Sequence, residues 1–242
     1  MAEGKTGKSA GKGRPGGAAR KNAATLEARI IDAALALAAK RPWGEVTLAD
    51  IAAKAGVGLG ELVAAFPSRL NIISAVMARI DAKVLDGLDP DLAAEPVRER
   101  LLDILISRFE ALAPHKAAVR SIARFLAHEP EAALALRRAV LRSQAAMLAG
   151  AGVETYGPGG AARALGLAFV YRQGLRVWLE DDDPGMARTM AEIDRRLRDG
   201  ERVLGRLAGI GGAARIARSL CSALLERRRK TAGTDSGGAP AA

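Results

Sequence analysis

The chain has 242 residues, enough for one large or two small domains, and 49% of them are hydrophobic while only 3% are aromatic. Its single cysteine, Cys221, excludes an internal disulfide and a metal site built from several cysteines, and no apolar run reaches the ~18 residues that span a membrane. The net charge of +10 favours a polyanionic partner, either nucleic acid or an anionic membrane surface. Abundant Ala, Leu and Arg, without strand-type alternation, predict an all-α protein.

The N-terminal segment 1–22 is a low-complexity stretch, and we expect it to be disordered. It lacks the apolar segment of a secretory signal, so a cytoplasmic location is expected. A basic arm can follow a phosphate backbone without sequence preference, although a tail that only aids solubility explains its charge equally well. Its basic side chains are Lys5, Lys8, Lys12, Arg14, Arg20 and Lys21.

The segment 23–85 predicts helices joined by short turns. An apolar stripe favours a first helix over about 25–40, which Pro-Trp-Gly then ends. Thr47 and Asp50 have the spacing of a capping box, in which each side chain accepts from a free backbone N–H of the next helix. That second helix is expected to end at Gly56, a residue suited to the left-handed conformation.

A third, short helix is expected over 59–65, and Ser68 caps a fourth helix that continues to about residue 85. Two short helices separated by a tight turn make a helix-turn-helix, the motif that places one helix in the major groove of DNA. The segment 23–85 is therefore predicted to be a helix-turn-helix domain.

The acidic, Pro-containing segment 86–96 is the clearest linker of the chain. A second helical domain is expected over 97–229, followed by a disordered tail over 230–242. Proline and glycine positions divide this domain into helices near 97–112, 115–127, 131–149, 160–181, 184–208 and 212–229.

Residues 25–85 resemble the TetR family of one-component repressors, through VTLADIAAKAGV, Gly60, Leu62 and AFPSRLNII. The resemblance implies a three-helix DNA-binding domain and a larger helical domain that holds an inducer pocket. It also implies a homodimer formed by the last two long helices, here 160–181 and 184–208. The expected function is then that of a repressor that binds a DNA operator and is released by a hydrophobic small molecule.

The same resemblance assigns the helix 59–65 as the recognition helix. The family has Ser or Thr at position 58, Tyr at 63 and His or Tyr at 65, where this chain has Gly, Val and Ala. The acid at position 61 repels phosphate, and together these residues leave the face with few hydrogen-bond donors. The alternative is a helix-turn-helix that is kept only as a scaffold and does not bind DNA. Thr47 and Arg69 would contact phosphate, and Gly58, Leu59, Gly60, Glu61, Ala64 and Ala65 would face the groove.

Bulky apolar side chains of the second domain are the candidates for a ligand pocket. Side chains of this kind also pack into ordinary cores, so both uses stay open for each of them. The candidates are Phe109, Phe125, Met147, Phe169, Tyr171 and Trp178.

Two segments, LAPHKAAVRSIARFL (112–126) and VWLEDDDPGMARTMAEIDRRL (177–197), resemble the TetR-fold lipid-binding accessory protein of ubiquinone biosynthesis. This second resemblance implies a degenerate helix-turn-helix, a bound isoprenoid lipid and a membrane-docking C-terminal helix. The basic amphipathic segment 212–230 fits such a helix, although packing on the core explains its pattern as well.

The acids within 180–183 can also be explained by a structural role, the capping of a helix. They stand at the unfavourable C-terminal end of one helix but can cap the next helix, which is expected to start at Pro184. Arg195 and Arg196 could then reach back to these acids.

Catalytic residues are not indicated by the sequence. His115 and His128 stand near helix ends without Cys or acidic neighbours at metal-ligand spacing, and no nucleophile motif occurs. We therefore expect no enzymatic activity, no metal and no cofactor.

Overall fold

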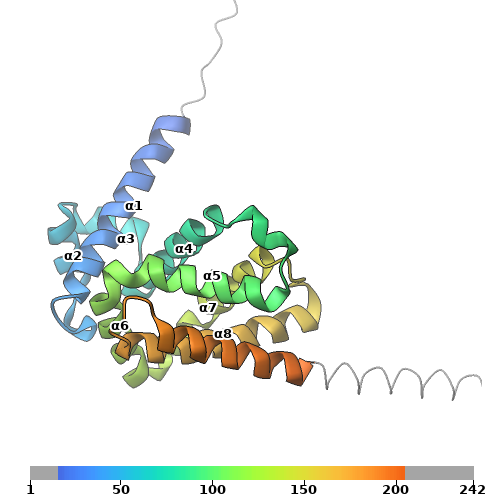
Figure 1. The fold of residues 1–242 in the computed structure, drawn as a ribbon. Helices are drawn as coiled ribbons and strands as arrows, with labels where there is room; N and C mark the ends of the chain where they lie inside the picture. The colour runs from blue at the N-terminus through green and yellow to red at the C-terminus, as the bar shows by residue number, and fades with distance from the viewer. Residues whose placement is uncertain (1–15, 205–242) are drawn as a thin grey trace, which may run out of the picture.

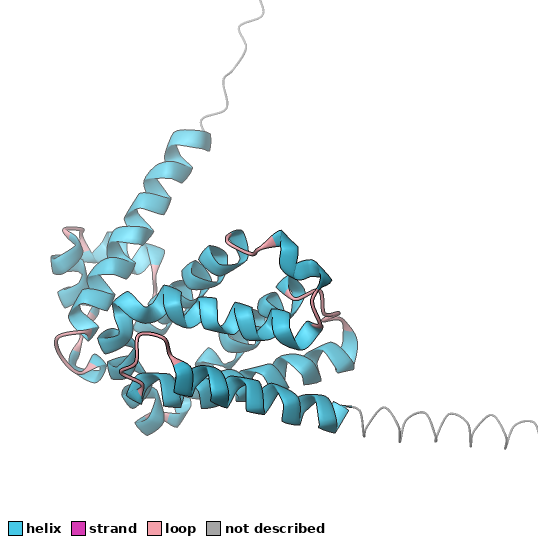
Figure 2. Cartoon of the chain, viewed as in Figure 1, coloured by secondary structure: helices cyan, strands magenta, loops and turns pink. Residues whose placement is uncertain are grey.

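The computed structural model describes residues 16–204, and within that range it contains helices and no strand (Figure 1, Figure 2). The all-α prediction is therefore confirmed. The α-helices are α1 (Gly16–Ala38), α2 (Leu48–Ala55), α3 (Leu59–Ala65), α4 (Arg69–Asp86), α5 (Val97–Leu112), α6 (Lys116–His128), α7 (Pro130–Gly150) and α8 (Gly157–Glu180). Short 3-10 helices lie at Trp43–Glu45, Pro90–Ala94 and Ala113–His115, and a further helix covers 187–204.

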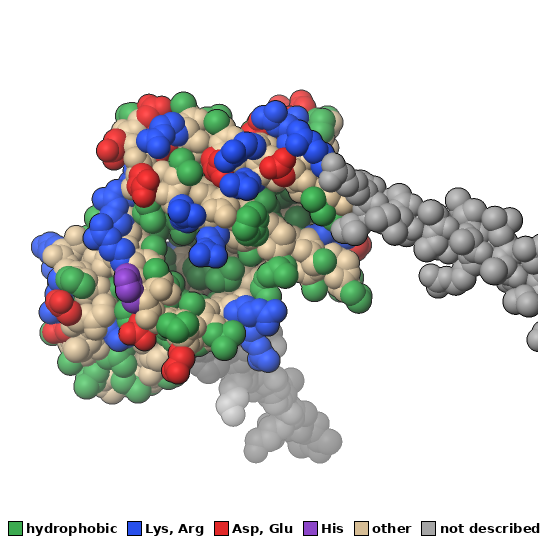
Figure 3. All heavy atoms as spheres, turned by 90° about the horizontal axis from the view of Figure 1, so that it is seen from below, with side chains coloured by type: hydrophobic (Ala, Val, Ile, Leu, Met, Phe, Trp, Pro, Cys, Tyr) green, Lys and Arg blue, Asp and Glu red, His purple; other side chains and the backbone are tan. Residues whose placement is uncertain are grey.

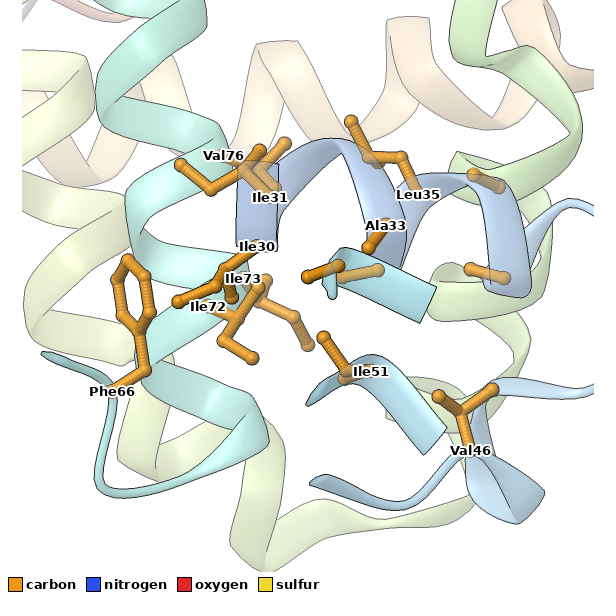
Figure 4. Close-up of a cluster of buried hydrophobic side chains, with 14 of the residues drawn as sticks. Ile30, Ile31, Ala33, Leu35, Val46, Ile51, Phe66, Ile72, Ile73 and Val76 are labelled. Carbon is orange, nitrogen blue, oxygen red and sulfur yellow. The ribbon is translucent and has the colours of Figure 1, made fainter. Parts of the chain in front are cut away.

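The first core lies among α1, α2, α3 and the first half of α4 (Figure 4). Ile30 from α1 points toward Ile72 and Ile73 from α4, and all three side chains are buried. Leu62, the buried residue of α3, and Ala118 of α6 belong to the same cluster. Burial of a large aliphatic side chain contributes about 1.5–3 kcal/mol, so this cluster fixes the position of the short helices.

The second core lies among the end of α4, α5, α7, α8 and the helix 187–204. Its fully buried side chains include Leu105, Phe109, Met147 and Ile193. Because α4 contributes Ile72 and Ile73 to the first core but Ile80 and Val84 to the second, this one helix joins the two halves.

Two helix boundaries and the linker differ from the sequence predictions. The helix α1 begins at Gly16, inside the expected disordered arm, because its AARKNAA segment has high helix propensity. The helix expected from Pro184 begins at residue 187, since the Asp183 carboxylate accepts hydrogen bonds from Gly185 N (3.0 Å) and Ala187 N (3.2 Å) and holds a turn there. The linker 86–96 contains a short 3-10 helix.

Residues 1–15 and 205–242 lie outside the described residues. The rest of the basic arm, the amphipathic segment 212–230, the tail 230–242 and Cys221 all fall there. Within the described part, no single helix has the length and apolar character to cross a membrane, whereas the bent pair of α3 and α4 meets these two criteria.

Candidate DNA-binding site

The first turn of α2 is closed by the predicted capping box. Asp50 N donates to Thr47 Oγ1 at 3.1 Å, and Thr47 N donates to Asp50 Oδ2 at 2.9 Å. The Thr47 hydroxyl itself donates to the same carboxylate oxygen at 2.7 Å. The hydroxyl is thus engaged within the chain, and a phosphate at this helix end would be met by the free backbone N–H groups of the first turn.

Asp50 is held in its charged form at this helix end. Hydrogen bonds from the side chain and the backbone of Thr47 lower the pKa of Asp50 below its usual value, and the neighbouring Arg41 adds to this effect. Arg41 Nη2 lies 2.6 Å from Asp50 Oδ2. The carboxylate therefore caps α2 at neutral pH and also fixes the loop that precedes the helix.

The turn between α2 and α3 depends on Gly56. Its φ of +65° lies in the left-handed region, where an L side chain is strained, as the sequence predicted. Arg29 of α1 donates from Nη2 to Ala55 O at 2.6 Å and to Gly56 O at 2.8 Å. A cation on the last carbonyls of α2 satisfies groups that the helix leaves free, so α1 holds the turn in place.

The outer face of α3 is exposed, while Leu62 anchors the opposite face in the first core. Leu59 is 49% exposed, and a Cβ atom placed at Gly58 or Gly60 would meet nothing within 4 Å. Glu61 and Ala64 are exposed as well. Five of the residues predicted to face the groove are therefore exposed: Gly58, Leu59, Gly60, Glu61 and Ala64.

Two residues of α3 differ from the expected arrangement. Ala65 is half-buried and packs against the first core, so it belongs to the edge of this surface. Val63, which the sequence analysis left out of the set, is 41% exposed beside Ala64. Its place one residue after the buried Leu62 was the available signal, because consecutive helix positions point in different directions.

Arg69 has a structural role in this arrangement. Its Nη1 donates to Trp43 O at 2.7 Å, Gly44 O at 3.1 Å and Val46 O at 2.7 Å. Its guanidinium also lies 5.5 Å from the centre of the Phe125 ring on α6. Arg69 thereby ties the start of α4 to the loop before α2, and its predicted phosphate contact stays a prediction.

The six candidate pocket residues do not line one site. Phe109 stacks on Tyr171 with ring centres 5.2 Å apart and lies 5.3 Å from Trp178, and Met147 is buried in the same core. Phe125, by contrast, packs against the first core. Phe169 is 51% exposed on α8. The sequence alone could not tell the buried aromatic residues from the exposed one, because each of them stands in an amphipathic or Ala-rich helix.

A buried polar group that the sequence analysis missed lies beside these aromatic rings. Arg108 of α5 is 2% exposed, its Nη2 lies 2.9 Å from Asp81 Oδ1 on α4, and its guanidinium lies 4.6 Å from the Tyr171 ring centre. On α7, Ser143 and Gln144 are also buried. Among the described residues, Arg108 Nε and Nη1 and both amide atoms of Gln144 have no hydrogen-bond partner.

The segment 177–197 forms a corner between α8 and the next helix. Asp181 Oδ2 accepts from Thr189 N at 3.0 Å and from Thr189 Oγ1 at 2.7 Å, so an acid caps the second helix as predicted. Arg195 and Arg196 pair with Glu192 rather than with the acids of the corner, because Glu192 is within one helical turn of both. In the segment 177–197, Asp181, Thr189 and Glu192 thus have structural roles at this corner.

Comparison with known proteins agrees with this geometry. Residues 30–76 match the family model described as bacterial regulatory proteins, tetR family. The fold is similar to that of a TetR transcriptional regulator from Nitrosomonas europaea, with 23% identity, a TM-score of 0.57, and coverage of 72% of this chain and 96% of that one.

A TetR transcriptional regulator from Rhodococcus sp. RHA1 is similar as well, with 22% identity, a TM-score of 0.53, and coverage of 73% of this chain and 96% of that one. No match was found among curated proteins. Residues 30–76 of the chain thus match the TetR family of bacterial regulatory proteins, and the chain shares its fold with these two structures.

Proposed function

We propose that this protein is a transcriptional regulator that binds a DNA operator as a dimer, with α3 in the major groove. The observation that carries the proposal is the open face of α3, which the buried Leu62 and the braced turn at Gly56 hold outward. In such an arrangement the N-terminus of α2 lies ready for a phosphate, and α3 presents side chains to base edges.

The chemistry of this face favours apolar contacts with bases. Leu59, Val63 and Ala64 can touch the methyl groups of thymine, and the glycines at 58 and 60 allow the backbone to approach closely. Glu61 is the ionisable group of α3 and accepts only, for instance from a cytosine amino group. We therefore propose a thymine-containing half-site with modest discrimination at each base pair.

A carboxylate placed in the centre of this face tests the proposal. Ala64→Glu is expected to lower the affinity for the DNA upstream of the protein's own gene at least tenfold, because the added charge is repelled by phosphate. Ala133→Glu places the same charge on an exposed position of α7 and is expected to leave binding unchanged. A salt-titrated binding assay measures both, and wild-type affinity no higher than for scrambled DNA would refute the proposal.

The native acid of α3 gives the opposite prediction. Glu61→Gln is expected to raise the affinity for the operator several-fold, since it removes a repulsive charge from the groove and keeps the size of the side chain. Glu110→Gln, at an exposed position of α5, is the matched control and should have no effect. A loss of affinity in Glu61→Gln would instead show that the carboxylate makes a favourable base contact.

We propose that the dimer forms through α8 and the helix 187–204. Both helices carry large apolar side chains that are exposed in the single chain, although each helix also contributes to the second core. Large apolar side chains left exposed in a single chain are typical of a protein–protein interface. They are Leu165 and Phe169 on α8, and Met190, Val203 and Leu204 on the following helix.

We further propose that DNA release follows the entry of a small molecule into the second core. The unpaired polar atoms of Arg108 and Gln144 support this, because buried donors and acceptors in native proteins nearly always have partners. The neighbouring rings of Phe109 and Tyr171 suit an apolar ligand body, so the ligand would be hydrophobic with a polar head. Native mass spectrometry of the purified dimer should detect such a molecule, and its addition should weaken operator binding; a ligand that leaves operator binding unchanged would contradict this step.

A further inference from the structure

A groove of about 550 Å³ separates the end of α1 and the following loop from one face of α6. Its volume lies within the range of small-molecule sites. The groove is distinct from the buried group around Arg108, since none of the residues of that group lines it. Its lining residues are Ala38, Ala39, Lys40, Arg41, Pro42, Trp43 and Gly44 on one side, and Ala117, Arg120, Ser121, Arg124, Phe125 and His128 on the other.

The charge of this groove has one sign. The lining includes four Lys or Arg side chains and His128, and it includes no carboxylate. Arg41 pairs with Asp50, and Arg120 donates to Leu179 O, whereas Lys40 and Arg124 have no ion pair with any described residue. Figure 3 shows one face of the molecule on which Lys and Arg side chains border a hollow. Cations that converge on a concave surface favour an anionic occupant.

Two buried N–H groups at the groove lack partners as well. Trp43 is 1% exposed, and neither its Nε1 nor Arg41 Nε has a hydrogen-bond partner among the residues of the described range. The backbone around them is satisfied: Trp43 N donates to Ser121 Oγ at 2.9 Å, and Ser121 Oγ donates to Arg41 O at 3.2 Å. The unpaired donors are therefore confined to two side chains whose residues line the groove.

We propose that this groove binds a phosphorylated small molecule. Phosphate offers several acceptor oxygens and negative charge, which match the fork of an Arg guanidinium and the point charge of a Lys ammonium. Trp43, Phe125 and the alanines of the lining provide an apolar wall for the remainder of the ligand. A nucleotide has both parts, so ATP is a suitable probe, with inorganic pyrophosphate as the minimal one.

The position of the groove gives such a ligand a regulatory consequence, which rests on the proposed DNA-binding function. One wall belongs to α6, and the other belongs to the loop that ends at the capping residue of α2. A bound phosphate would join the two walls beside the link that Arg69 makes between the loop and Phe125. It would thus restrict the motion of the α2 N-terminus relative to α6 without contacting α3.

Binding is tested by calorimetry on the full-length protein at about 150 mM salt, where weak surface attraction is screened. ATP and pyrophosphate are expected to bind and adenosine is not. The double variant Lys40→Gln/Arg124→Gln changes two exposed side chains and should weaken ATP binding roughly tenfold or more. The control Arg137→Gln/Arg138→Gln removes the same charge from exposed positions of α7 and should bind ATP as the wild type does.

A second readout locates the ligand. The chain has two tryptophans, so its ¹⁵N NMR spectrum has two indole N–H signals, and ATP should shift that of Trp43 but not that of Trp178. An unshifted Trp43 signal, no binding of either phosphate, or equal weakening in the control variant would each overturn the proposal. The proposal would also be wrong if the Lys40→Gln/Arg124→Gln variant bound ATP normally but had a lower affinity for DNA in the absence of ATP. That result would show that these two cations contact DNA.

Discussion

Arg108→Met is expected to lower the free energy of unfolding by about 3–5 kcal/mol, because it leaves the Asp81 carboxylate buried without its cation. Methionine keeps most of the side-chain volume, so little of this loss comes from a cavity. The double variant Asp81→Leu/Arg108→Met removes both charges and should recover most of the stability. Denaturant unfolding of the single and double variants measures the coupling, and two equally unstable variants would contradict this account of the pair.

The same pair predicts a dependence of stability on pH. Burial raises the pKa of Asp81 above its usual value, and the attraction of Arg108 together with a hydrogen bond from Ser143 offsets this only in part. The folded protein therefore binds this proton more tightly than the unfolded chain does. Its stability should fall as the pH rises from the ordinary carboxyl pKa through the higher pKa of the folded state.

The double variant isolates this effect, because it lacks Asp81 and retains the other carboxyls that shift, such as Asp50 and Asp181. The difference in unfolding free energy between the wild type and the double variant should therefore decrease with rising pH across that window. A difference that grows with pH would show that Arg108 lowers the pKa of Asp81 below its ordinary value.

Phe169→Glu is expected to convert the proposed dimer into monomers at micromolar concentration. The ring is 51% exposed on α8 in the single chain, and burying an ionised carboxylate at the centre of an interface is costly. The nearby Arg196 guanidinium, 5.8 Å from the ring centre, already pairs with Glu192 and would offset this cost only in part. Leu134→Glu is the matched control, since Leu134 is 69% exposed on α7, outside the proposed interface. Analytical ultracentrifugation compares the two variants.

Loss of the dimer should also weaken operator binding by orders of magnitude, because both half-sites are then no longer held together. The folded state of the monomer is checked by its circular dichroism spectrum. A Phe169→Glu protein that remains dimeric would place the interface elsewhere, and equal dissociation of Leu134→Glu would show that charge alone separates the chains.

The elements of the helix-turn-helix could be predicted from local sequence signals. Thr47 with Asp50 marked the start of α2, Gly56 marked its end and Ser68 marked the start of α4, and the structure shows these residues in those roles. Each signal depends on hydrogen bonds or backbone angles within a few residues, so one sequence suffices to recognise it. The residues of α3 expected to face the groove came instead from the resemblance to the TetR family.

Contacts between distant helices could not be predicted in this way. Arg69 resembled a phosphate ligand, but its partners are carbonyls 23–26 residues away. Phe125 and Phe169 looked equivalent to Phe109 in sequence, although they face different surroundings. The sequence did contain a sign that Arg108 is buried and paired. It stands between Leu105 and Leu112 on the buried stripe of α5, where a charged residue needs a partner.

The reading of DNA by α3 is tested most directly by selection of genomic fragments with the purified dimer. Wild-type protein and Ala64→Glu are each incubated with sheared genomic DNA at about 150 mM salt, and the bound fragments are sequenced. The account predicts that only the wild type enriches a two-fold symmetric site with half-sites about one helical turn, roughly 10 base pairs, apart. If both proteins enrich the same fragments, or neither enriches any, then α3 does not read an operator and the central claim is wrong.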